Sequence, residues 1–241
     1  VQSFFDNGYT VDVARHQLTV SFFEHGESDT IVSFLKHIQA LKIKNIIYVL
    51  PPALHVTKKT SSVIQEKISD LIKLTTKYKA HAVIEAASQS YKHLMYVIKP
   101  FKPAQLSIVF DPVQIVKTGG STLSQYRLYK KYIQYFVCHD ITKDKLPTLM
   151  GYGQTQIIQL FKRLKKDNYK GSFICDPPFE HMLSTYQKHS KGLLKMFRKK
   201  ELSQMEKLRS MMKISDDQKT LTLFDLYKHQ YDVLRIIFRL R

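Results

Sequence analysis

The segment "SIVFDPVQIVKTGG" (residues 107–120) joins a short apolar run to an acidic turn and a glycine pair. Ile108, Val109 and Phe110 have the β-branched and aromatic composition of a strand. The run ends at Asp111, which a proline follows. A carboxylate at the end of a buried strand is costly to desolvate unless it has a partner. The segment therefore predicts either a tight turn or a metal-binding group at Asp111.

Similar apolar runs alternate with amphipathic segments along the chain. The apolar runs predict strands, and the 3.6-residue spacing of the segments between them predicts helices. Strands that are apolar on both faces and alternate with helices are typical of a parallel sheet. The predicted strands are 1–5, 18–23, 45–50, 81–86, 106–111, 135–140 and 172–176, and the predicted helices are 29–42, 60–78, 121–132 and 154–171.

An open doubly wound sheet and a β/α barrel share this local pattern. No Gly-x-Gly-x-x-Gly motif follows an early strand, which weakens a dinucleotide-binding interpretation. Beyond residue 178 the pattern changes to basic helices over 181–215 and a further helix over 216–241. We therefore expect a β/α domain over residues 1–200 and a helical C-terminal extension over 201–241.

The composition bounds the class of protein. Apolar residues make up 44% of the 241 residues, which is enough for a core, and no apolar run approaches the roughly 20 residues of a membrane helix. We expect a soluble cytoplasmic protein in which Cys138 and Cys175 are reduced and buried. No signal peptide is visible in the first residues. Because the chain begins at Val1 and not at Met, we expect a fragment, a processed product or the ordered part of a longer protein.

The net charge of +18 allows three interpretations. The first is a lysine-rich, solvated exterior, the second is a basic surface for nucleic acid or phosphorylated ligands, and the third is a site for a partner protein.

Four side chains fall at predicted strand ends and can bind a cation. In a β/α barrel the reactive groups gather at the C-terminal ends of the strands. Three carboxylates and one imidazole would suit Mn²⁺, Mg²⁺ or Zn²⁺. Taken singly, each has a structural alternative: the acids as helix caps or turn residues, and the histidine as a core residue. The four candidates are Glu85, Asp111, His139 and Asp176.

Three stretches resemble the xylose isomerase-like superfamily of TIM barrels, which holds sugar phosphate isomerases and epimerases and their endonuclease IV relatives. They are "HAVIEAAS" (81–88), "SIVFDPVQIVKTGG" (107–120) and "LPTLMGYGQTQIIQLFKRLKKDNYKGSFICDPPFE" (146–180). Their order and spacing agree with the family over roughly residues 1–200. The resemblance implies a (β/α) TIM barrel, here lacking its first βα unit before Val1.

The resemblance also implies a chemistry. A divalent metal held by the four strand-end residues would polarise a sugar, and Glu85 and Asp176 would move a proton between adjacent carbons. Gln114, His55 and Lys117 are the candidate substrate contacts. Gln114 stands where the family has a histidine, and Asp176 stands where it has a glutamate. The metal site can therefore be intact, weakened or lost.

The register after the strand at 135–140 has two solutions. If Asp140 matches the aspartate that follows the family's ligand histidine, the ligand position falls on Val137. If His139 is itself the ligand, the chain must shift locally.

Three functions follow. The first is a metal-assisted sugar or sugar phosphate isomerase or epimerase. The second is a catalytically inactive barrel that senses a ligand or serves as an interaction domain. The third, less favoured, is a nucleic-acid enzyme of the endonuclease IV type. The expected partner is a small sugar or sugar phosphate and no membrane, and a homo-oligomer is allowed.

Overall fold

The computed structural model describes residues 11–26, 29–52, 54–86, 91–175, 179–180, 183, 199–212 and 221–239. The chain forms two compact units, one made of Val1–Phe110 with Tyr129–Tyr135 and the other of Asp111–Leu128 with Phe136–Arg241. The strand predicted at residues 1–5 lies outside the described residues.

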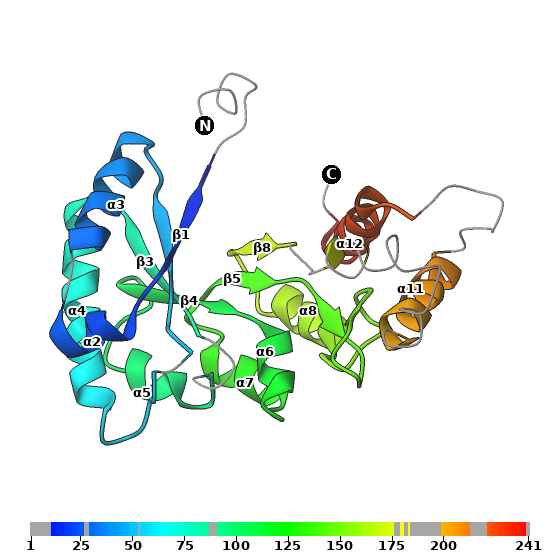
Figure 1. Ribbon diagram of the computed structural model, residues 1–241, viewed down its shortest axis with the longest axis horizontal. Helices are drawn as coiled ribbons and strands as arrows, with labels where there is room; N and C mark the ends of the chain where they lie inside the picture. Colours follow the sequence, from blue (N-terminus) through cyan, green and yellow to red (C-terminus); the bar gives the residue numbers. More distant parts are fainter. Residues whose placement is uncertain are drawn as a thin grey trace. The chain divides into compact units, whose positions relative to one another are not determined.

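The first unit is built on four parallel strands: β1 (Val13–Gln17), β2 (Asn45–Val49), β3 (His81–Glu85) and β4 (Leu106–Phe110). Figure 1 shows the helices α2 (Val20–His25), α3 (Asp29–Ala40) and α4 (Ser61–Lys77) on the same side of these strands. The short helices η1 (Tyr91–His93) and α5 (Leu94–Ile98) lie between β3 and β4 in the chain.

Burial explains why these strands form where the sequence predicts them. The three central residues of β2 and of β3 are buried, and all five residues of β4 are buried. Helix α4 turns a face of Ile64, Ile68 and Leu71 inward. Its Thr75 hydroxyl lies 2.8 Å from the buried Tyr48 hydroxyl of β2. The strands predicted at 45–50, 81–86 and 106–111 are thus confirmed.

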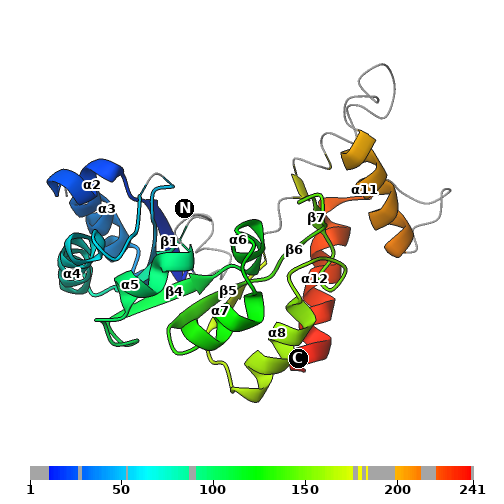
Figure 2. The same cartoon turned by 90° about the horizontal axis from the view of Figure 1, so that it is seen from below.

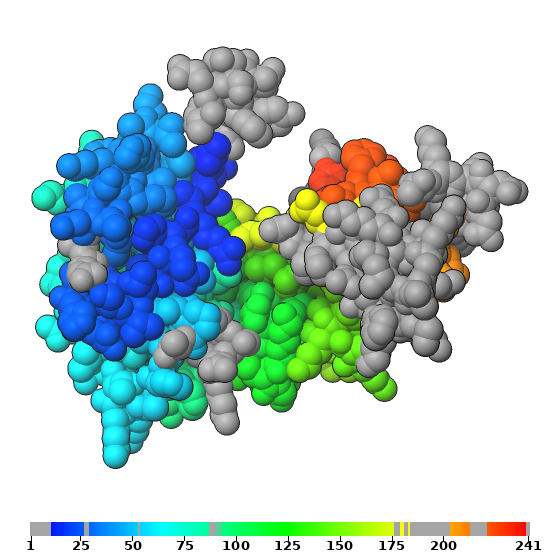
Figure 3. Space-filling model, in the orientation of Figure 1, coloured from blue at the N-terminus to red at the C-terminus, as the bar shows by residue number. Residues whose placement is uncertain are grey.

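The strand predicted at residues 18–23 is wrong, because this stretch contains helix α2. The Thr19 side chain caps the helix by accepting from the Phe22 backbone N–H, and Gly26 ends it with a φ of 76°. Such caps outweigh the strand preference of the Val and Phe residues between them. The strand β1 lies earlier, at Val13–Gln17, and parts of β1 and α2 reach the surface in Figure 3, in dark blue.

The second unit contains the end of β5 (Ile133–Val137), the last strand β8 (Ser172–Ile174) and the antiparallel pair β6 (Asp140–Ile141) and β7 (Pro147–Thr148). The parallel sheet has the order β1-β2-β3-β4-β5-β8. The helices are α6 (Pro112–Lys117), α7 (Thr122–Tyr129), α8 (Ile157–Lys166), α11 (Lys199–Met211) and α12 (Leu223–Phe238). The helices predicted at 121–132 and 154–171 are confirmed, and β5 begins two residues before its predicted start.

The C-terminal helices share the core of the second unit. Figure 2 shows α8 beside α12, and Phe161 of α8 packs against Phe238 of α12 with ring centroids 5.6 Å apart. A further buried cluster joins α11 and α12 to the chain after β7; its members are Leu149, Phe179, Leu183, Met205, Leu208, Leu221 and Leu226. The helix predicted at 216–241 is confirmed as α12, and the domain boundary at residue 200 stays a prediction.

Two further expectations meet the structure here. Cys138 is buried as predicted, whereas Cys175 is exposed, so the prediction of a buried thiol is wrong for Cys175. Within the described part of the chain, no helix has the length and apolarity required to span a membrane.

Candidate functional site at the strand ends

Two of the four predicted site residues meet in the second unit. Asp111 follows β4 and His139 follows β5, and their Oδ1 and Nε2 atoms lie 2.8 Å apart. The same Asp111 oxygen accepts hydrogen bonds from the backbone N–H groups of Val113 and Gln114, which cap α6. Both side chains are largely withdrawn from solvent, at 7% exposure for Asp111 and 12% for His139. Asp111 is therefore a helix cap and the partner of a buried imidazole at once.

The second ring nitrogen of His139, Nδ1, is the atom of this pair that could contact a ligand. With the proton on Nε2 donated to Asp111, Nδ1 is left as an acceptor. That atom is buried and has no hydrogen-bond partner among the residues that the structure describes. When a carboxylate fixes the tautomer of an imidazole, the other ring nitrogen can accept a hydrogen bond from a ligand hydroxyl, take up a proton or bind a metal.

Glu85, the third predicted site residue, lies at the end of β3 in the first unit. Arg15 of β1 donates to both of its carboxylate oxygens, from Nε at 2.9 Å and from Nη2. Arg15 lies opposite Ile47 of β2 in the sheet, so the ion pair crosses the intervening strand. Such a fork-shaped contact fixes the carboxylate and neutralises its charge. Sequence reasoning missed Arg15 because it missed β1.

The remaining predicted residues are scattered. Asp176 lies outside the described residues. Gln114 is half-buried on α6 and contacts the pair through its backbone N–H. Lys117 is exposed at the other end of α6, and His55 is exposed, with its carbonyl accepting from the Thr60 hydroxyl.

The described residues do not fit a divalent metal as the family resemblance implies. They contain no group of three or more His, Cys, Asp or Glu side chains placed to share an ion. Glu85 is held by Arg15, and the Asp111 Oδ1 atom is occupied by two N–H groups and an imidazole. The amide of Gln114 is a poorer ligand than a histidine.

The register after β5 stays a prediction. Asp140, which begins β6, has a structural role. It is 1% exposed and accepts hydrogen bonds from the backbone N–H groups of Ile141, Gly151, Gly153 and Thr155 and from the Thr155 hydroxyl. Its carboxylate therefore organises the loop after β7 and is saturated. His139, one residue earlier, is the residue that reaches Asp111.

The same contacts explain the Gly-x-Gly stretch at 151–153. Gly151 has a φ of +92°, which favours glycine. A Cβ atom on Gly153 would collide with the Asp140 carboxylate and the Ile141 carbonyl oxygen. Gly151 is thus favoured by its backbone conformation, and Gly153 by the close approach of Asp140 and Ile141.

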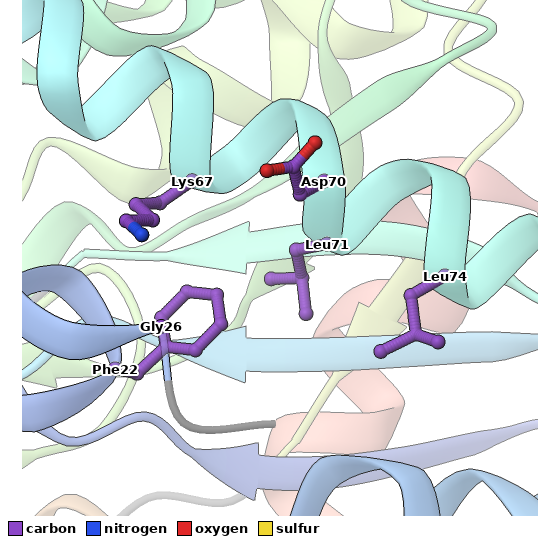
Figure 4. A pocket seen from close by; sticks show the side chains of 6 residues that line it. All are labelled: Phe22, Gly26, Lys67, Asp70, Leu71 and Leu74. Atoms are coloured by element: carbon purple, nitrogen blue, oxygen red, sulfur yellow. The ribbon is translucent and has the colours of Figure 1, made fainter. Parts of the chain in front are cut away.

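A hollow of about 300 Å³ lies on the first unit between α2 and α4 (Figure 4). Phe22 and Leu71 form an apolar floor, and Lys67 and Asp70 of α4 stand at its rim. Its lining includes none of the strand-end residues predicted to bind a ligand.

Comparison with known structures gives the fold class. A sugar phosphate isomerase/epimerase from Parabacteroides distasonis is similar with a TM-score of 0.58 at 11% identity, over 90% of this chain and 75% of that one. A xylose isomerase domain protein from Planctomyces limnophilus has a TM-score of 0.57 at 16% identity, over 78% of each chain. The IolI protein with a bound zinc atom has a TM-score of 0.56 at 14% identity, over 71% of this chain and 69% of that one.

Protein-family models and curated sequences give no match. The structural similarities alone show that the chain has the fold of the xylose isomerase-like TIM barrels, and identities this low establish only the fold.

Proposed function

We propose that this chain is a sugar-binding barrel of the isomerase and epimerase fold class that recognises its ligand without metal-centred proton transfer. The Arg15–Glu85 ion pair carries this proposal. In the expected chemistry Glu85 would bind a metal and move a proton, and both roles need an available carboxylate lone pair. A guanidinium that already spans both oxygens competes with each role.

The pair of Asp111 and His139 supplies the recognition in this proposal. The Nδ1 atom of His139, which is buried and has no hydrogen-bond partner among the described residues, would accept a hydrogen bond from a sugar hydroxyl. A site built to hydrogen-bond a hydroxyl rejects analogues that lack it, because its buried polar atom is then left unpaired. Polyhydroxylated ligands meet this requirement, and the structures of similar fold carry sugar isomerase and epimerase names.

Metal-assisted isomerisation is the second candidate, and one observation favours it. A histidine that donates one N–H to a carboxylate and leaves its other nitrogen unoccupied has the usual arrangement of a metal-ligating histidine. In this case Nδ1 of His139 would face the ion, with Asp111 orienting the ring and Asp176 as a further ligand.

Isothermal titration calorimetry with a panel of ketoses, aldoses and polyols separates the two candidates. The sugar-binding proposal predicts an affinity that EDTA does not change and that His139→Ala weakens by roughly tenfold, the loss of about one hydrogen bond. Asp144→Asn, at an exposed position in the loop after β6, is the matched control. Affinity that requires Mn²⁺ or Zn²⁺, or turnover of a bound sugar, would instead establish the second candidate.

We further propose that a phosphorylated ligand would place its phosphate near Lys117. This residue is exposed at the end of α6, and the following turn contains Gly119, whose φ is +74°. Lys117→Gln should weaken binding of a sugar phosphate and leave binding of the parent sugar unchanged. Equal effects on both ligands would remove Lys117 from the site. Cytoplasmic location and a homo-oligomeric state remain proposals, to be checked by cell fractionation and light scattering.

A further inference from the structure

The two cysteines of the chain meet across neighbouring strands of the second unit. The Cys138 backbone N–H, just after β5, donates to the Ile174 carbonyl oxygen at the end of β8, over 2.8 Å. In a parallel ladder, a residue that donates to one carbonyl lies opposite the residue that follows it. Cys138 therefore lies opposite Cys175, although the two are far apart in sequence.

This juxtaposition satisfies the geometry of a disulfide. Neighbouring strands are roughly 4.7–4.9 Å apart, and disulfides form between Cα atoms roughly 4.4–6.8 Å apart. Both cysteines are free thiols in the structure, Cys138 with no exposed surface and Cys175 exposed. The thiols interact directly: a hydrogen bond from Cys138 lowers the pKa of Cys175, whereas burial, followed by this bond, raises the pKa of Cys138 well above its usual range.

We propose that Cys138 and Cys175 form a dithiol modification site, which a peroxide converts into a disulfide joining the ends of β5 and β8. The exposed position of Cys175 makes it the sulfur that a dissolved oxidant reaches first. The buried Cys138 is then the resolving thiol, already placed beside it.

The reaction balances with hydrogen peroxide as the oxidant. The Cys175 thiolate attacks one peroxide oxygen and the O–O bond breaks, which leaves a sulfenic acid on Cys175 and a hydroxide that takes the thiol proton to become water. The Cys138 sulfur then attacks the Cys175 sulfur, so that the S–S bond forms and the S–O bond breaks. The departing hydroxide leaves as a second water with the Cys138 proton. Two thiols lose two electrons, and peroxide gains them.

The bond would have a consequence for the strand-end pair. Cys138 directly precedes His139, whose ring contacts Asp111. A covalent link to β8 would restrict the chain beside this imidazole. The protein would then exist in a dithiol form and a disulfide form, and the proposed sugar binding does not depend on the disulfide.

Peptide mapping of the whole chain tests the proposal. The protein is treated with hydrogen peroxide, alkylated with N-ethylmaleimide and digested with trypsin without reduction. The expected product links "YIQYFVCHDITK" (132–143) to "GSFICDPPFEHMLSTYQK" (171–188), and dithiothreitol separates the two peptides. The monomer should lose about 2 Da, the mass of two hydrogen atoms.

Two variants assign the roles of the thiols. Cys138→Ala should leave a sulfenic acid on Cys175 that dimedone traps, and Cys175→Ser should leave Cys138 unmodified. Circular dichroism checks that both variants are folded. The proposal is overturned if the wild-type chain accumulates sulfinic acid on Cys175 while Cys138 is still alkylated, or if Cys175 links only to a second copy of the chain.

Discussion

Arg15 and Glu85 are joined across β2, with the guanidinium of β1 donating to both carboxylate oxygens at the end of β3. The Arg15 side chain is 62% exposed and the Glu85 side chain 19% exposed. The family resemblance predicts Glu85 as a metal ligand, whereas in the structure this carboxylate is paired with a guanidinium. It also links the first strand of the sheet to the third.

A double-mutant cycle with Arg15→Met and Glu85→Gln should give a coupling free energy of about 0.5–1 kcal/mol, the range of solvent-exposed ion pairs. Urea denaturation of the four proteins measures it. The coupling should shrink in 1 M salt, at which the screening length is about 3 Å. The exposed pair of Lys73 and Asp70, joined at 3.0 Å within α4, is the control and should couple no more strongly. A coupling that is unchanged in 1 M salt would contradict an electrostatic origin of the contact.

Asp140→Asn should destabilise the protein by roughly 3 kcal/mol. The carboxylate accepts from five donors, two at Oδ2 and three at Oδ1. In asparagine one of these oxygens becomes an NH2 group that faces at least two of the donors, and buried polar groups left unpaired cost about 1–3 kcal/mol each. Urea denaturation monitored by circular dichroism measures the loss. Asp144→Asn, exposed in the neighbouring loop, should change stability by less than about 0.5 kcal/mol. Equal effects of the two substitutions would contradict the role assigned to Asp140.

Two glycine substitutions separate steric collision from backbone strain. Gly153→Ala should cost about 2–4 kcal/mol, because its new Cβ would meet the Asp140 carboxylate and the Ile141 carbonyl. Gly119→Ala should cost only about 1–2 kcal/mol, because its φ of +74° is unfavourable but no atom of the described residues lies within 4 Å of the new Cβ. Thermal denaturation of both variants gives the order, and a reversed order would show that the loop repacks.

The stability of the fold should fall at alkaline pH. Burial raises the pKa of Tyr48 from 10.0 to about 12, and the hydrogen bond with Thr75 only partly opposes this shift. Because the folded state disfavours the tyrosinate, the stabilisation is complete below pH 10 and is lost as the pH rises from about 10 to 12. Tyr48 alone accounts for roughly 2–3 kcal/mol of this loss.

Urea denaturation between pH 8 and 11.5 measures the effect. Tyr48→Phe should make the pH dependence less steep by the share of one tyrosine, because burial also raises the pKa of Tyr126 and of Tyr129. The variant should also lower stability at pH 8 by about 1 kcal/mol through loss of the hydrogen bond. Tyr152→Phe, at a 58% exposed position, should leave the profile unchanged. Parallel profiles for the wild-type chain and Tyr48→Phe would assign the alkaline loss to other groups.

The strands buried on both faces could be predicted from sequence, because runs such as 106–110 are apolar throughout. The first strand could not, because Arg15, His16 and Gln17 give it a polar sequence. The apolar stretch after it looked like a strand because only its two capping residues mark the helix: the side chain of Thr19 caps its start, and the left-handed backbone of Gly26 ends it.

The candidate site could likewise be predicted only in part from the sequence. Sequence reasoning placed Asp111 and His139 at strand ends, where the structure finds them together. It could not decide whether Asp111 caps a helix or serves a ligand, because the two roles use the same residue after the same strand. The contact of Arg15 with Glu85 depends on strand order, which a single sequence does not encode locally.

Because one oxygen of Asp111 both starts α6 and holds His139, the position of that helix and the tilt of the imidazole are mechanically linked. A ligand that presses on α6 would rotate the ring, and a ring pulled toward a ligand would draw the helix after it. Movement of α6 and rotation of the His139 ring would thus be coupled through the Asp111 carboxylate.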